Sequence, residues 1–280
     1  MSSSMNKVSL KTRIISYIIL ILFTVITIFP FIWMTYSSFK LKGAISMDPL
    51  GLPKNPTLAN YQKALKFGHM GISFLNSLIY SSISTAGAVM LSVSIGFALT
   101  KFKYRSAKIF MGFFTMGLLI TVNSVITPLF IMETTIGIYN TYLGVILPYI
   151  AFGLPMAVLI SCSFIRGIPD SLIEAAIIDG STYIQIFWKI IVPISTPVIA
   201  TNAVLNFLGN WNEFLMVFTL TSGQEKRSLP VTINSFAGRL VSDYGLQFSA
   251  LVIGTIPMFI FYILLHDKLL AGFGEGAIKE

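Results

Sequence analysis

Long stretches without charge constrain the fold of this chain more than any other feature. A helix needs about 20 mostly apolar residues to cross the hydrocarbon core of a bilayer. Charge-free stretches, one of which contains a histidine, cover residues 14–38, 68–100, 109–132, 134–165, 190–212 and 244–265. They predict six membrane-spanning helices, at about 14–37, 74–99, 109–131, 142–165, 195–220 and 247–269.

The composition agrees with this prediction. Hydrophobic residues make up 55% of the chain and charged residues 11%, whereas an ordinary soluble domain has about 25% charged residues. The fold class is therefore predicted to be all-α, a polytopic membrane protein with six transmembrane helices. Lys7, Lys11 and Arg13 precede the first span as they would precede a secretory signal. That span is too long for a signal, and no cleavage pattern follows before Lys40, so we expect it to remain as an anchor.

The basic residues indicate which connections are cytoplasmic. The net charge is +8, and the positive-inside rule explains the cations without nucleic-acid binding, because they lie in the connections. The stretch KFKYRSAK, residues 101–108, holds four positive charges, whereas the connection at 132–141 holds none. We therefore expect residues 101–108, residues 174–193 and both termini to be cytoplasmic. Five lysines in the first external loop run against this assignment: Lys40, Lys42, Lys54, Lys63 and Lys66. Charges in a loop long enough to fold count for less.

The spans and connections divide the chain into four parts. We expect a cytoplasmic tail at 1–13, a first span with an external loop at 14–72, a five-span core at 73–272 and a cytoplasmic tail at 273–280. The core contains a cytoplasmic loop at 166–193 and an external loop at 222–245. Thr57 is placed to cap a short surface helix in the first external loop, with Leu58, Tyr61 and Leu65 on one side.

A polar segment, EAAIIDGSTYIQIFWKIIVP at residues 174–193, interrupts the apolar chain. Asp170 or Ser171 is expected to cap a helix that ends near Ile178. Gly180 can adopt a positive φ and end that helix, after which Ser181 or Thr182 caps a second one. The product is an elbow of two short helices. Such an elbow suits docking into a groove of a partner protein, and a solvated connecting helix is the alternative.

The same residues resemble the EAA loop of ATP-binding-cassette importer permeases. Glu174-Ala175-Ala176 is followed after three residues by Gly180, and after nine more by Ile190 and Val192-Pro193. The family usually has leucine where Val192 stands. The similarity extends through most of the chain and points to the carbohydrate-uptake, maltose-type branch. It is carried by NPTLANYQKAL, FLNSLIYSS, SIGFALTKFKYRSAKIF, GNWNEFLMVFTL, LPVTINSF and LLAGFGEGAIKE.

The resemblance implies a type I importer permease fold and a subunit that translocates a mono- or oligosaccharide into the cytoplasm. It implies as partners a homologous second permease, two copies of a cytoplasmic ATPase and an extracytoplasmic sugar-binding protein, in the cytoplasmic membrane of a bacterium or archaeon. In such relatives the elbow is the coupling helix, so the candidate ATPase contacts are Glu174, Ala175, Ala176, Asp179 and Gly180. The 222–245 loop of relatives reaches the binding protein, and its candidate contacts are Leu229, Pro230, Ser235 and Phe236.

The sequence has no phosphate-loop motif and no Gly-Lys pair, so we expect ATP and magnesium to bind the partner ATPase and not this chain. The chain is therefore expected not to be an enzyme, and no acid, base and nucleophile converge in it. His69 and His266 are far apart in sequence, and no metal site is expected. Cys162 is the single cysteine, which excludes an intrachain disulfide.

The fifth span offers a candidate translocation path. Asn202, Asn206, Asn210 and Glu213 recur at spacings of four, four and three and so share one face of a helix, with Trp211 close by. Polar side chains at this depth usually face a bundle interior or a water-filled cavity. The alternative is that the asparagines only hydrogen-bond to neighbouring helices. Ser77, Ser81 and Ser84 in the second span are expected to be close-packing contacts. Asn123 and Ser124 beside Pro128 could mark a helix break in the third span, or they could equally be a satisfied buried pair.

Two other transport functions remain open from the residues alone. One is an importer of the same architecture that carries a polyol or a phosphodiester. The other is an ion-coupled secondary transporter, which would usually keep ionisable relays at mid-membrane. This chain has one acid near a span boundary, Glu213, and no obvious duplication.

Overall fold

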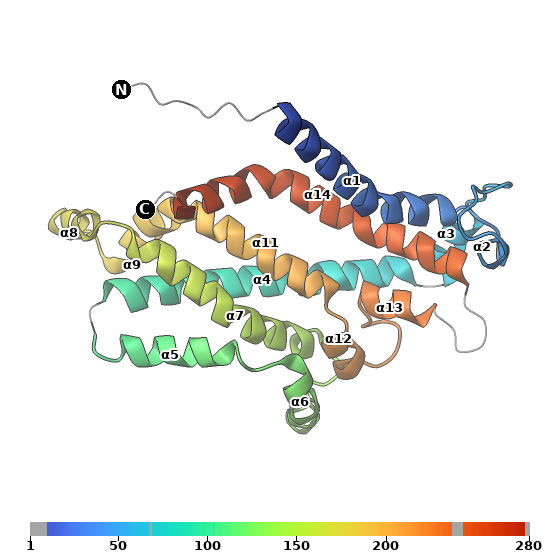
Figure 1. Ribbon diagram of the computed structural model, residues 1–280. Coiled ribbons are helices and arrows are strands. Elements are labelled where there is room, and N and C mark those ends of the chain that lie inside the picture. The colour runs from blue at the N-terminus through green and yellow to red at the C-terminus, as the bar shows by residue number, and fades with distance from the viewer. Residues whose placement is uncertain (1–9, 68, 103, 237–242, 278–280) are drawn as a thin grey trace. The chain divides into compact units, whose positions relative to one another are not determined.

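The computed structural model describes residues 10–67, 69–102, 104–236 and 243–277, with the backbone alone for residues 67, 261 and 264–277. Every regular element within these residues is a helix (Figure 1). The chain divides into two compact units. The smaller comprises Met1–Gly68 and Phe236–Ile253, and the larger comprises His69–Ser235 and Gly254–Glu280.

The smaller unit contains α1 (Leu10–Ser37), α2 (Ala44–Met47), α3 (Ala59–Phe67) and the first turns of α14 (Tyr244–Ala277). Lys40 is buried in this unit and is 3% exposed. Its Nζ donates to the carbonyl oxygens of Asp48 and Pro49, at 2.7 and 3.1 Å. One of the five lysines that run against the positive-inside assignment therefore stabilises the fold of the loop in which it lies. Its presence there has a structural reason and does not indicate on which side of the membrane the loop lies.

The short helix expected in the first external loop is α3. Thr57 does not occupy the N-cap position, which is Leu58, but its Oγ1 accepts a hydrogen bond of 3.1 Å from the backbone N–H of Ala59, the first residue of the helix. Its buried face differs from the apolar side expected from the sequence. Asn60 and Ala64 are buried, whereas Leu58 and Leu65 are more than half exposed. The Asn60 amide donates to two backbone carbonyls of the preceding segment, and this bonding decides which face turns inward.

The larger unit is built on three helices that pack side by side (Figure 1): α4 (Met70–Lys101), α7 (Tyr142–Arg166) and α11 (Thr196–Asn212). Small residues let α4 and α7 approach closely. A Cβ on Gly96 would lie 3.1 Å from the Cβ of Ser161, so the glycine has no room to spare. Small residues at helix interfaces are typical of membrane bundles, where packing replaces the hydrophobic effect as the driving force.

Two of the predicted spans each consist of two helices. The third consists of α5 (Ala107–Gly117) and α6 (Val122–Ile136), which meet at 99°. The break lies just before the Asn123-Ser124 pair, and Ser124 Oγ donates to the carbonyl of Thr121 at 2.8 Å. The predicted fifth span, 195–220, comprises α11 and the short α12 (Leu215–Leu220). Sequence length alone does not reveal such breaks, because both halves of each span are apolar.

By length and composition α1, α4 and α7 can each cross a bilayer, and two bent pairs qualify if each counts as one span. These pairs are Ala107–Gly117 with Val122–Ile136, and Tyr183–Ile194 with Thr196–Asn212, which meet at 75°. The sixth predicted span, 247–269, lies within α14, whose residues Tyr244–Ile260 are a shorter apolar stretch. The all-α, polytopic fold class is confirmed.

Candidate functional site

The elbow between α7 and α11 begins with α8 (Asp170–Ile178). The residue at the N-cap position is Pro169, which makes no side-chain hydrogen bond. The prediction that Asp170 or Ser171 caps this helix is therefore wrong. Gly180 has a φ of 80°, which confirms the predicted left-handed break. Thr182 then caps the next helix in a reciprocal capping box with Gln185, at 3.3 and 2.9 Å. That helix runs through α9 (Tyr183–Ile186), the π-helical turn η1 (Phe187–Ile191) and α10 (Val192–Ile194).

Two of the nine residues of α8 have side chains buried in the core of this chain. Ile173 and Ala176, three residues apart, are each 8% exposed and join an apolar cluster with Phe97, Ile165 and Ile186. Four of the five predicted ATPase contacts lie on the exposed side: Glu174, Ala175, Asp179 and Gly180. Ala176 does not lie on the exposed side, because it packs in the apolar cluster and anchors α8 to the core.

Sequence reasoning missed three apolar residues beside Glu174. Leu172, Ile177 and Ile178 are 44%, 44% and 85% exposed, although α8 belongs to no span. An exposed cluster of large apolar side chains with one carboxylate is typical of a protein contact surface. The signal was present in the sequence as two consecutive isoleucines that follow the buried alanine.

Four polar residues of the predicted translocation path come together at one cavity. Asn202, Asn206, Asn210 and Glu213 line a cavity of about 250 Å³. Apolar and aromatic side chains complete the lining, among them Tyr149, Phe152 and Met156 of α7. The periodicity of the sequence therefore predicted one shared face, and the structure places a cavity along it.

The sequence left two interpretations of the asparagines open, that they line a cavity or that they hydrogen-bond to neighbouring helices. The structure shows that the two apply to different residues. Asn202 is fully buried, and its Nδ2 donates to the carbonyl of Ala157 at 3.1 Å and to Ser161 Oγ at 2.9 Å, so it links α11 to α7. Ser161 Oγ in turn donates to Ser92 Oγ on α4 at 3.1 Å. Asn206 bonds within its own helix, from Nδ2 to the carbonyl of Asn202 at 2.9 Å, and to no other helix among the described residues. Its Oδ1 points at Gly153 of α7, where a Cβ would collide with it.

Glu213 lies where α11 ends and secures the start of α12. Its Oε1 accepts a hydrogen bond of 2.8 Å from the N–H of Met216, and its Oε2 accepts one of 3.0 Å from the hydroxyl of Tyr149. The carboxylate thus lies at the C-terminal end of the polar stripe and is bonded to two other segments. Tyr149 was not identified from the sequence, because it stands alone in an apolar run of α7.

The structure does not bring Trp211 to the cavity. Trp211 is 3% exposed, and its Nε1 donates to the carbonyl of Gly254 in α14 at 3.3 Å. Its ring contacts Phe74 edge-on and stacks on Phe207, each at 5.7 Å between centroids. It packs on the other side of α11 from the polar stripe, because the stripe faces α7.

The predicted external loop at 222–245 is partly helical. Its α13 (Leu229–Ser235) packs on α4. Leu229 is buried, and its N–H donates to Ser77 Oγ at 2.7 Å, which confirms Ser77 as a packing contact. Ser84 likewise donates to the carbonyl of Ile146, at 3.3 Å, and Ser81 is fully buried. The other predicted binding-protein contacts, Pro230, Ser235 and Phe236, retain accessible surface. Residues 237–242 of this loop lie outside the described residues.

Asn76 of α4 hydrogen-bonds to the backbone of this loop. Its Nδ2 donates to the carbonyls of Glu225 and Arg227, at 2.8 and 3.0 Å, while its Oδ1 accepts from the hydroxyl of Tyr142 at 2.9 Å. The hydroxyl of Tyr80 adds a bond of 2.9 Å to the carbonyl of Lys226. The loop therefore has a defined conformation on this end of α4.

A family model described as "Binding-protein-dependent transport system inner membrane component" matches residues 86–271. The chain is similar to the diacetylchitobiose uptake system permease protein NgcG of Streptomyces coelicolor, at 33% identity over 95% of this chain and 88% of that protein. It is also similar to the trehalose/maltose transport system permease protein MalG of Thermococcus litoralis, at 32% identity over 95% of this chain and 97% of that protein.

Among solved structures, a bacterial ABC transporter involved in the import of the acidic polysaccharide alginate contains a similar chain. The TM-score is 0.83 at 21% identity, over 94% of this chain and 99% of that one. This similarity shows that the two chains share a fold.

Proposed function

We propose that this chain, which belongs to the family of binding-protein-dependent transport system inner membrane components, is a permease subunit through which a sugar enters the cytoplasm. Sugars are the solutes named for both of the relatives described above, which match this chain over nearly its whole length. Energy for transport comes from ATP hydrolysed on a separate subunit.

The observation that carries the proposal is the exposed face of the elbow. Glu174 and Ala175 lie beside exposed Ile177 and Ile178 on α8. This helix ends at the turn formed by Gly180, between two spans. An amphipathic helix of this kind docks into a groove of a partner. That partner is a cytoplasmic ATPase, present in two copies, which binds ATP and magnesium. The elbow and both termini are then cytoplasmic.

The mechanism follows from coupling two states of one assembly. ATP closes the pair of ATPase subunits and draws together the elbows of this chain and of a homologous second permease. The spans then rock from an inward-open to an outward-open state, into which an extracytoplasmic binding protein releases the sugar. Coupling requires that ATP and sugar each favour one of the two states.

The cavity beside α11 supplies the chemistry that a sugar needs along its path. The amides of Asn206 and Asn210 can donate to and accept from hydroxyl groups. Phe152 and Tyr149 offer flat apolar surface in the same lining. Sites of this kind combine mostly apolar walls with a few oriented polar groups.

The test begins with the cognate binding protein, titrated by calorimetry with mono- and oligosaccharides, polyols and glycerophosphodiesters. The tightest ligand is then offered in labelled form to liposomes that contain this chain, the second permease and the ATPase. We expect a sugar to bind, and uptake to require ATP. Binding of a polyol or a phosphodiester alone would contradict the sugar assignment. Uptake that follows an ion gradient without the ATPase would contradict the importer mechanism.

A further inference from the structure

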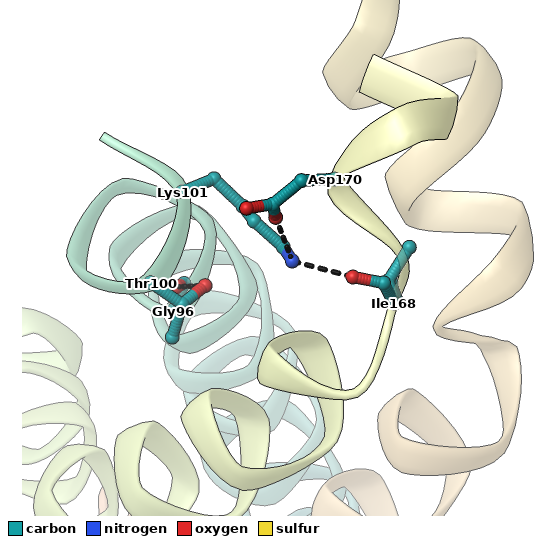
Figure 2. Close-up of polar contacts among 5 residues, drawn as sticks. All are labelled: Gly96, Thr100, Lys101, Ile168 and Asp170. Carbon is teal, nitrogen blue, oxygen red and sulfur yellow. Dashed lines mark hydrogen bonds and ion pairs between the residues drawn. The ribbon is translucent and has the colours of Figure 1, made fainter. Parts of the chain in front are cut away.

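An ion pair joins the end of α4 to the beginning of α8. Lys101, the last residue of α4, places its Nζ 2.8 Å from Oδ1 of Asp170, the first residue of α8 (Figure 2). The Lys101 side chain is 5% exposed and that of Asp170 is 49% exposed. The pair is therefore a buried cation held by a carboxylate that remains partly in contact with solvent.

Lys101 holds the segment before α8 at a second point. Its Nζ also donates to the carbonyl oxygen of Ile168, in the link between α7 and α8 (Figure 2). The neighbouring Thr100 side chain turns back to the carbonyl of Gly96 in its own helix, at 2.7 Å. Among the residues that Figure 2 labels, Lys101 is the one whose side chain crosses from α4 to the elbow.

The helix dipoles favour this arrangement. A cation at a helix C-terminus and an anion at a helix N-terminus each interact favourably with the partial charge of their own helix. Lys101 ends α4 and Asp170 begins α8, so each charge suits its own helix as well as its partner. Because Lys101 is almost fully buried, loss of Asp170 would leave an uncompensated charge inside the protein.

The apolar contacts of α8 with the core lie along one face of the helix. Ile173 and Ala176 anchor one face of the helix. Next to them lies a cavity of about 410 Å³, lined by Phe102, Glu174 and Tyr183 as well as by the ion pair itself. Lys101 and Asp170 line this cavity together with Ile173, so the contact of Lys101 with the first turn of α8 lies beside the apolar contacts of the helix.

We propose that Lys101 is a positioning residue that makes α8 and α4 move as one body, so that a displacement of the elbow reaches the translocation cavity. The inference rests on the proposed function, in which an ATPase displaces α8. It goes beyond that function because it names the connection through which the displacement enters the bundle.

A continuous hydrogen-bonded path leads from α4 to the cavity. Ser92 lies nine residues before Lys101 on α4, about 14 Å along a helix with a rise of 1.5 Å per residue. Its hydroxyl bonds to Ser161 of α7, which bonds to Asn202, whose carbonyl accepts from Asn206. A shift of α4 therefore acts directly on the polar groups that line the cavity.

The test uses the complete transporter in liposomes, with its binding protein and sugar, and measures molecules of sugar imported per ATP hydrolysed. Lys101→Met removes the charge and keeps the length of the side chain, Lys101→Arg keeps the charge, and Asp170→Asn removes the carboxylate. Lys108→Met removes another charge of the same cytoplasmic cluster from an exposed side chain and serves as the control. Co-purification of the ATPase reports assembly in every variant.

We expect Lys101→Met and Asp170→Asn to lower the ratio of sugar to ATP about tenfold or more, the change produced by about 1.4 kcal/mol of lost coupling. Lys101→Arg and Lys108→Met should keep the wild-type ratio, and all variants should retain the ATPase. An unchanged ratio in Lys101→Met overturns the inference, as does loss of the ATPase from that variant, which would make Lys101 a residue of assembly. If the wild-type complex itself shows no ATP-dependent uptake, the proposed function fails instead.

Discussion

The hydroxyl of Tyr149 on α7 donates a hydrogen bond of 3.0 Å to the carboxylate of Glu213, the residue at which α11 ends. The same carboxylate accepts a hydrogen bond of 2.8 Å from the N–H of Met216 in α12. One side chain therefore ties three helices at one end of the polar cavity. The turn between α11 and α12 depends on a side chain from α7.

Replacement of Tyr149 with phenylalanine removes this tie and keeps the ring. We expect slower sugar uptake and a loss of about 1.5 kcal/mol in the free energy of unfolding in detergent, because the lost bond is made to a carboxylate. Tyr17→Phe, at a half-exposed tyrosine of α1, is the control and should change neither quantity. In combination with Glu213→Gln the two losses should be less than additive. Full additivity would show that the two residues act independently.

Replacement of Asn206 with leucine tests whether the cavity is used by the solute. Asn212→Leu is the matched control, since Asn212 is exposed and also bonds within its own helix, to the carbonyl of Leu208 at 2.9 Å. We expect Asn206→Leu to impair uptake about tenfold, as the loss of one or two hydrogen bonds would, with the ATPase still bound. Equal uptake by the two variants would show that the solute does not use the amide of Asn206.

Replacement of Gly153 with alanine should act on the same cavity from the opposite wall. The added Cβ would collide with Oδ1 of Asn206 and force that amide to turn. Gly209→Ala adds the same methyl group to the same cavity lining, where no atom lies within 4 Å. The measured rate of sugar uptake should fall in Gly153→Ala and stay at the wild-type level in Gly209→Ala. A normal rate in Gly153→Ala would mean that the orientation of Asn206 is unimportant.

Replacement of Gly180 with valine should uncouple ATP hydrolysis from uptake. A β-branched residue does not tolerate the φ of 80° at this corner, so the exposed face of α8 would turn away from its partner. Glu174→Lys should uncouple through charge reversal at the same face. Gly137→Val is the control, since it places the same strain at a φ of 79° in the connection after α6. ATPase activity and uptake are measured together in liposomes. Normal transport by both elbow variants would refute the docking role.

Replacement of Asn76 with alanine should release the loop at 222–235 from α4. The variant loses two hydrogen bonds to backbone carbonyls, at 2.8 and 3.0 Å. We expect faster amide hydrogen exchange over residues 222–235 and weaker stimulation of the ATPase by the binding protein. Ser94→Ala on the same helix removes only a bond to the carbonyl of Met90 and should leave exchange unchanged. Unaltered exchange in the Asn76 variant would show that the loop is held by other contacts.

The sequence alone predicted the features that depend on local chemistry. The lengths of the apolar runs predicted the long apolar helices, of which α1, α4 and α7 can each cross a bilayer, because bilayer thickness sets the number of residues required. Gly180 and Thr182 predicted the elbow, because a positive φ and a helix cap are properties of single residues and their neighbours. The four-residue spacing of the asparagines predicted that they share one face.

Only the tertiary structure decided what each face meets. Ala176 turns inward and Ile178 outward, Trp211 packs against α14 and not on the cavity, and Asn202 links α11 to α7 while Asn206 lies against Gly153. Lys101 and Asp170 are 69 positions apart and Tyr149 and Glu213 are 64, and neither pair leaves a periodic signal in the chain. Such pairs form when helices pack, since the rotation of each helix about its axis is chosen by all of its neighbours together.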